Sequence, residues 1–77
     1  MRTDTEKSLG VAIRSRRVSR KMTLTALGQA TGIDVSQLSK VERGISRTSV
    51  DAYDRIAEAL GWTPAAMWRA ASSRRAA

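Results

Sequence analysis

The side chains that could do chemistry in this chain are basic and hydroxylic, and the types used most often in catalysis are missing. The 77 residues include no Cys and no His, which excludes disulfides, thiol and imidazole catalysis, and most transition-metal sites. The seven acids are Asp4, Glu6, Asp34, Glu42, Asp51, Asp54 and Glu58. They show neither the spacing of metal ligands nor a pairing with a nucleophile. We therefore expect no enzymatic activity, no metal and no cofactor.

Lysine and arginine dominate the charged residues. Fourteen of them stand against seven acids, which gives a formal net charge of +7 and a pI near 11.4. The excess is concentrated at the start: residues 1–21 hold seven bases and two acids, whereas residues 22–48 and 49–77 carry a net +1 each. Such a chain favours polyanions, above all nucleic acid, with an anionic membrane surface as the rival.

One segment, residues 35–43, arranges hydrogen-bonding groups in helical register. At about 100° per residue, Leu38 and Val41 share one face of a helix. The opposite face carries Val35, Ser36, Ser39, Lys40 and Arg43. Lysine can donate to guanine O6 and N7, serine can serve either base type, and valine can pack on a thymine methyl group. This face therefore predicts contact with a DNA major groove, with Gln37 at its edge.

Five helices are expected to position these groups, at about 6–20, 24–31, 35–43, 49–60 and from 64 onward. Their predicted N-caps are Thr23, Asp34, Ser49 or Thr48, and Thr63, and the glycines that end helices are Gly32, Gly44 and Gly61. Strand signals are nearly absent, because there is no Phe and no sustained alternation. The sequence predicts an all-α, compact five-helix domain over residues 6–70, with frayed ends at 1–5 and 71–77.

The centre of this domain is the segment TLTALGQATGIDVSQLSKVERG, residues 23–44. Two short helices are joined there by a tight turn, in which Gly32 can take a positive φ. Gly28 leaves room where the two helices cross. The apolar residues expected to close this corner are Leu27, Ile33, Leu38 and Val41.

This segment resembles the helix-turn-helix of the phage lambda repressor and Cro (Xre-like) family. The apolar positions, Glu-Arg-Gly at 42–44 and Ile-Ala-Glu-Ala-Leu-Gly at 56–61 carry the resemblance, which extends from about Leu9 to Trp68. It implies a sequence-specific regulator of transcription, a repressor that places its third helix in the major groove of a palindromic operator. The implied partner is double-stranded DNA, bound by a homodimer, without a small-molecule ligand or a membrane.

The resemblance also implies which residues touch DNA. The family reads bases mainly at the positions of Val35, Ser36 and Lys40, and Ser39 lies on the same face. Free N–H groups and the dipole at a helix N-terminus favour phosphates, and in the family the loop after the third helix commonly lies along the DNA backbone. The expected backbone contacts are Thr23, Thr25, Gln37, Arg43, Ser46 and Arg47.

Two further roles follow from the resemblance. The family pairs an arginine of the first helix with the glutamate that closes the third, so Arg17 and Glu42 should form a partly buried, structural ion pair. Related repressors dimerise through the C-terminal end, which nominates Pro64, Ala66 and Trp68 as interface residues.

Four positions depart from the family pattern. They are Arg16 for a usual Leu, Lys21 for a common Gly, Leu24 for a phosphate-binding Gln, and Thr31 for a packing Ala.

Other classes of function stay open. One is an interaction module, such as an antitoxin that carries the same DNA-binding fold and also binds a toxin. Another is a protein that only coats nucleic acid or binds anionic membrane through its basic first helix. No apolar run approaches the roughly 20 residues that span a bilayer, and the polar N-terminus does not resemble a signal peptide. We therefore expect a cytoplasmic protein, associated with the nucleoid through DNA.

Overall fold

The computed structural model describes residues 4–76, and the side chains of residues 4–72. This part forms five helices and contains no strand, which confirms the all-α prediction. The helices are α1 (Asp4–Ser19), α2 (Leu24–Thr31), α3 (Val35–Glu42), α4 (Val50–Ala59) and α5 (Pro64–Ala76). None of them is long and apolar enough to cross a membrane.

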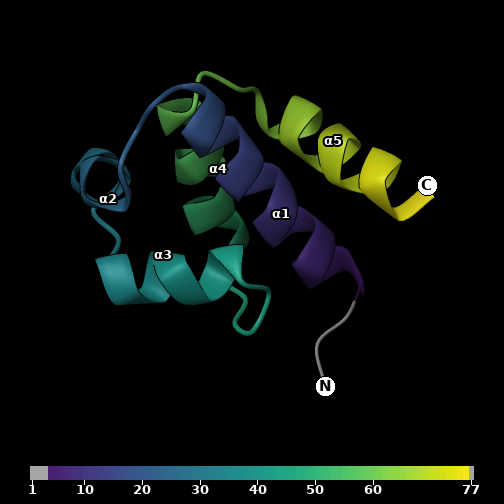
Figure 1. Ribbon diagram of the computed structural model, residues 1–77, viewed down its shortest axis with the longest axis horizontal. Helices are drawn as coiled ribbons and strands as arrows, with labels where there is room; N and C mark the ends of the chain where they lie inside the picture. The colour runs from purple at the N-terminus through teal and green to yellow at the C-terminus, as the bar shows by residue number, and fades with distance from the viewer. Residues whose placement is uncertain (1–3, 77) are drawn as a thin grey trace.

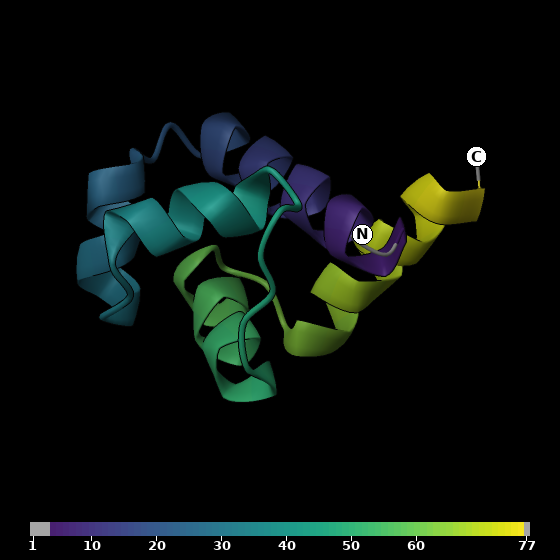
Figure 2. The same cartoon turned by 90° about the horizontal axis from the view of Figure 1, so that it is seen from below.

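The helix α1 runs through the middle of the molecule and organises the others. It packs along α5 on one side and against α3 on another, while α2 contacts both α3 and α4 (Figure 1). Turned by 90°, the molecule shows α3 in front of α1, with α5 at the opposite end (Figure 2). The short pair α2–α3 therefore stands at one end of the molecule, and α5 stands at the other.

Each of α2 to α5 begins with a side-chain oxygen that accepts a backbone N–H of the first turn. The capping residues are Thr23, Asp34, Ser49 and Thr63. Ser49, rather than its neighbour Thr48, is thus the cap of α4. Three glycines with φ of 75°, 72° and 72° follow α2, α3 and α4, namely Gly32, Gly44 and Gly61. The left-handed backbone at these positions explains why each helix ends where the sequence indicates.

The two outer helices are longer than the sequence indicates. α1 begins at Asp4, and α5 continues to Ala76, although fraying is expected from residue 71. The predicted tail begins inside this helix, because Ala71 packs in the core and α5 continues through residues 72–76. Residues 1–3 and 77, also assigned to frayed ends, lie outside the described residues.

The core collects apolar side chains from all five helices. Its buried members are Leu9, Ile13, Leu27, Leu38, Val41, Tyr53, Ile56, Ala57, Leu60, Met67 and Ala71. Trp62 and Trp68 are half-buried against this cluster. Val50 has the helical spacing of the α4 apolar stripe but is 68% exposed. The first residue of α4 projects beyond the core, which α4 enters at Ala52 and Tyr53.

Candidate nucleic-acid interface

The corner between α2 and α3 is closed by a contact that leaves little room for a side chain at Gly28. A Cβ atom built on Gly28 would lie 3.0 Å from the Ile33 carbonyl oxygen and 3.2 Å from Val35 Cγ2. Leu27 and Leu38 are fully buried beneath this crossing. The corner predicted from the sequence is therefore confirmed, and it fixes α3 rigidly relative to α2.

Thr31, at the end of α2, forms side-chain hydrogen bonds with the backbone of the turn, which the usual alanine could not form. Its hydroxyl donates to the Leu27 carbonyl oxygen at 2.8 Å and accepts the Ile33 N–H at 3.3 Å. The Thr31 carbonyl oxygen in turn accepts from Arg55 Nη1 of α4 at 2.7 Å. A cation at the C-terminus of a helix is favourable for the helix dipole, so Arg55 ties α4 to the end of α2.

The outward face of α3 presents the predicted groups to solvent, but unequally. Val35 is 39% exposed, and Ser36 and Lys40 are exposed as well. Ser39 is half-buried, and its carbonyl oxygen accepts from Arg43 Nε at 3.3 Å. Of the four predicted base-reading residues, Ser39 is therefore the least accessible.

Ser36 is hydrogen-bonded to the N-cap of its own helix. One carboxylate oxygen of Asp34, Oδ2, accepts the backbone N–H of Ser36 at 3.0 Å and also the Ser36 hydroxyl. The side-chain bond first, and then the backbone bond, lower the pKa of the Asp34 carboxyl below its ordinary value. Asp34 is exposed, so the outward face of α3 begins with an ionised acid, which the sequence analysis treated only as a cap.

The predicted ion pair between α1 and α3 is confirmed. Arg17 Nε and Nη2 donate to the two carboxylate oxygens of Glu42 at 2.7 and 3.0 Å, and the side chains are only 11% and 3% exposed. The hydrogen bond with Glu42 raises the pKa of the Arg17 guanidinium. Arg17 Nη1 also donates to the Met22 carbonyl oxygen at 2.9 Å. One guanidinium thus joins α1, the turn before α2, and the end of α3.

Beside this ion pair, α1 approaches α3 more closely than any side chain would allow. A Cβ atom on Gly10 would lie 2.5 Å from the carbonyl oxygens of both Val41 and Glu42. No role is predicted for Gly10 from the sequence. The available signal was a lone glycine inside a helical pattern, which is costly unless a close packing contact requires it.

The loop after α3, residues 43–49, is held from both sides. On the α3 side, Gln37 Nε2 donates to Ser46 Oγ at 3.2 Å, so two residues predicted to touch the DNA backbone bind one another. On the α1 side, Arg47 Nε lies 3.7 Å from Glu6 Oε2. The Glu6 side chain is 10% exposed and that of Arg47 is 77% exposed. A buried carboxylate on α1 therefore lies beside a solvent-facing guanidinium of the loop.

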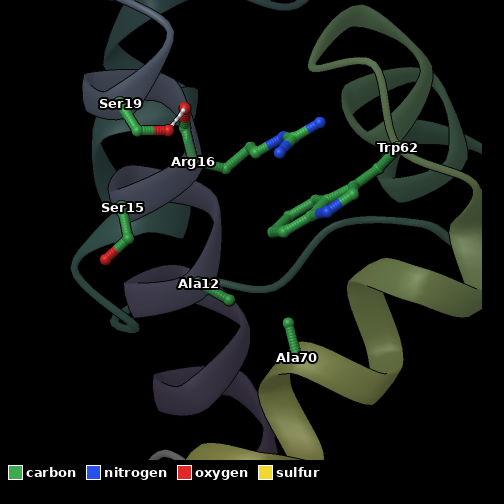
Figure 3. Close-up of a pocket in the computed structure, with 6 residues that line it drawn as sticks. All are labelled: Ala12, Ser15, Arg16, Ser19, Trp62 and Ala70. Carbon is green, nitrogen blue, oxygen red and sulfur yellow. Dashed lines mark hydrogen bonds between the residues drawn. The ribbon is translucent and has the colours of Figure 1, made fainter.

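Arg16, which replaces the usual leucine, caps α4 instead of facing DNA. Its Nε and Nη2 donate to the carbonyl oxygens of Leu60 and Gly61 at 2.9 and 3.3 Å. Figure 3 shows its guanidinium lying over the indole of Trp62, 5.2 Å from the ring centroid. This stack forms one wall of a shallow hollow of about 280 Å³ between α1 and α5.

Three residues nominated for dimerisation lie on α5, which packs against α1 and α4. Pro64, Ala66 and Trp68 are all half-buried. The Trp68 ring meets Tyr53 edge-on, with ring centroids 5.9 Å apart and planes at 66°, so part of this surface also serves the core of the single chain.

This geometry agrees with comparisons to known proteins. A family model described as helix-turn-helix matches residues 13–67. The chain belongs to the helix-turn-helix family. One relative is an uncharacterized HTH-type transcriptional regulator, y4wC of Sinorhizobium fredii, which is 36% identical over 56 residues covering 73% of this chain. The match covers only 39% of that relative's length.

Solved structures of similar helix-turn-helix proteins cover nearly the whole chain. The clp gene regulator ClgR of Corynebacterium glutamicum superposes with a TM-score of 0.90 at 30% identity, over 94% of this chain and 77% of that one. The restriction-modification controller protein C.AhdI of Aeromonas hydrophila gives a TM-score of 0.76 at 26% identity, over 79% of this chain and 92% of that one. The five-helix arrangement is thus shared with known regulators.

Proposed function

We propose that this helix-turn-helix protein is a sequence-specific regulator of transcription, a repressor that binds double-stranded DNA. The observation that carries the proposal is the outward face of α3, where Ser36 and Lys40 are exposed on a helix whose other face is fixed in the core. The names of the relatives support it, since they are a transcriptional regulator, a gene regulator and a controller protein. Catalysis has no part in the proposal.

In the proposed complex, α3 lies in the major groove and its outward residues contact bases. The base-contacting set is Val35, Ser36, Ser39 and Lys40. Backbone phosphates are bound on either side by the N-terminus of α2 and by the loop 43–49. The phosphate-contacting set is Thr23, Thr25, Gln37, Arg43, Ser46 and Arg47, within which the Gln37–Ser46 pair acts as one unit.

The proposed operator is a palindrome bound by a homodimer. Pro64, Ala66 and Trp68 on α5 supply a half-buried, mainly apolar surface for a second copy. Two α3 helices of such a dimer should lie about 34–36 Å apart, one turn of DNA. The dimer then reads the same half-site twice.

Selection of bound sites from a pool of random double-stranded oligonucleotides tests this function. The expected result is an enriched motif with two inverted half-sites whose centres are separated by about one helical turn, 10–10.5 base pairs. A variant with both Ser36→Ala and Lys40→Ala retains the buried face of α3 and serves as the matched control, which should lose the motif. If the unmodified protein enriches no motif at low protein concentration, the proposed function is wrong.

A further inference from the structure

The hydrogen-bonding groups on the outward face of α3 have a fixed polarity at Ser36. The hydroxyl of Ser36 donates its proton to Asp34 Oδ2. An ionised carboxylate can only accept, and a charge-assisted hydrogen bond is roughly twice as strong as a neutral one. A base that offers only acceptors competes poorly for that proton. Ser36 Oγ therefore meets the DNA with its lone pairs, as an acceptor.

Lys40 supplies the opposite polarity one turn further along the same face. Residues four apart lie above one another on a helix, separated by about 6 Å along its axis. The Lys40 ammonium group is exposed and can only donate. Its charge also acts favourably on the Asp34 carboxylate. The reading face thus changes from acceptor at Ser36 to donor at Lys40.

We propose that Ser36 accepts a hydrogen bond from a major-groove amino group, adenine N6 or cytosine N4, and so reads which strand of the contacted base pair carries that amino group. Adenine N6 and cytosine N4 are the major-groove donors, whereas guanine and thymine present only acceptors there. A base that presents an acceptor to Ser36 Oγ and the Asp34 carboxylate would form no hydrogen bond with them. Its lone pairs would instead face the lone pairs of these oxygens in the complex. Lys40 should contact guanine within about two base pairs, given a rise of about 3.4 Å per step. The inference rests on the proposed function.

Asp34 has a second consequence for binding to random DNA. Its exposed negative charge stands on the surface that approaches the phosphates, and it repels them whatever the sequence. The same carboxylate therefore weakens unspecific binding while it fixes the polarity of Ser36. Removing its charge should tighten binding to random DNA and reduce discrimination at one base.

The test begins by mapping the base that Ser36 contacts. Site selection is repeated with Ser36→Ala, and the base pair whose preference disappears is taken as the contacted pair, in which the adenine or cytosine carries the amino group. Duplexes are then synthesised with hydrogen in place of the amino group at this position, as purine for adenine or pyrimidin-2-one for cytosine. Fluorescence anisotropy gives the Kd for each duplex and for a random duplex.

The unmodified protein should lose about five- to tenfold in affinity when the amino group is removed, the lower part of the range for a base contact. Asp34→Asn keeps a good N-cap, and on the same duplexes it should lose less than about twofold while accepting guanine or thymine there. Glu58→Gln makes the same charge change at an exposed position of α4 and should behave as the unmodified protein does.

Three results would overturn this inference while leaving specific DNA binding intact. They are a loss of less than about twofold for the unmodified protein when the amino group is removed, equal losses for the unmodified protein and Asp34→Asn, and a Ser36→Ala selection with unchanged preferences. A selection without any motif would instead defeat the proposed function, so the two failures can be told apart.

Discussion

At the scale of single residues, the Arg17 guanidinium holds together the parts of the helix-turn-helix that must not move. It binds both carboxylate oxygens of Glu42 and the Met22 carbonyl oxygen. The two ionic side chains are almost wholly removed from water. Either charge left alone would therefore be expensive to bury.

Replacing Glu42 by Gln should destabilise the fold, because it leaves the Arg17 guanidinium without its counter-charge. Breaking a well-buried pair costs about 3–5 kcal/mol, and each 1 kcal/mol shifts Tm by roughly 4–8 °C in a domain of this size. Thermal unfolding followed by circular dichroism measures the loss. The double variant Arg17→Met with Glu42→Leu should recover much of it, since a packed apolar pair can replace a buried ion pair. Strictly additive losses would show that the two residues do not interact.

A second residue-scale prediction concerns Lys21, which has a φ of 57° and is the one non-glycine with positive φ among the described residues. Lys21→Gly should stabilise the protein by about 0.5–1 kcal/mol, because the left-handed backbone strains an L-residue more than it costs glycine. The measurement is Tm. Lys21→Ala removes the same charge but retains the strain, so an equal rise in both variants would contradict a backbone cause.

At the scale of elements, the sequence predicts the α2–α3 corner well because its determinants are local. The caps Thr23 and Asp34 and the glycines 28 and 32 lie within the segment that they shape. The supports of this corner are not local. Glu6 contacts Arg47, and Gly10 admits the end of α3, both across more than 30 residues of sequence. Such contacts leave no periodic signal, which is why reasoning from the sequence missed them.

For the loop 43–49, we predict the effect on DNA binding of removing the Arg47 side chain. Arg47→Ala should weaken binding to all DNA sequences about equally and lower the slope of log K against log salt by about one unit, because a phosphate contact carries no base information. Binding titrations at several salt concentrations, on selected and random duplexes, measure both effects. Arg69→Ala removes an exposed charge from α5 and should change the slope little. A loss confined to the selected duplex would show that Arg47 reads a base.

At the scale of the whole molecule, the net charge of +7 overstates what DNA can meet. Arg16 and Arg55 bind the carbonyl groups that end α4 and α2, and Arg17 binds Glu42. Within the basic first segment, Arg16 and Arg17 therefore hold helices together, whereas the other described bases, Lys7, Arg14, Arg20 and Lys21, are exposed. The composition indicated a polyanion as partner, but it could not distinguish basic side chains that cap helices from basic side chains that face solvent.

The salt dependence of DNA binding by the proposed dimer tests this division of charge. Three basic residues are exposed on or beside α3, namely Lys40, Arg43 and Arg47. Two copies of them would contact about six phosphates, the lower end of the range of about 6–10 that proteins commonly neutralise. Affinity should then fall about 10³-fold between 50 and 200 mM salt, and not the 10⁵-fold of the upper end. Anisotropy titrations across this range give the slope. A nearly flat response would mean that this surface does not bind DNA.

If the outward face of α3 reads bases, replacing Lys40 by Ala should change the sequence preference of the protein without unfolding it. The substitution leaves the buried face of α3 untouched, so Tm should stay unchanged. The measurement compares the Kd for the selected duplex, for each of its single-base variants and for random DNA, with and without the substitution. We expect the preference for the selected base to disappear at one or two positions, each worth about 1–3 kcal/mol of binding free energy. The preferences at the other positions should remain. An equal loss on every sequence, random DNA included, would contradict this expectation.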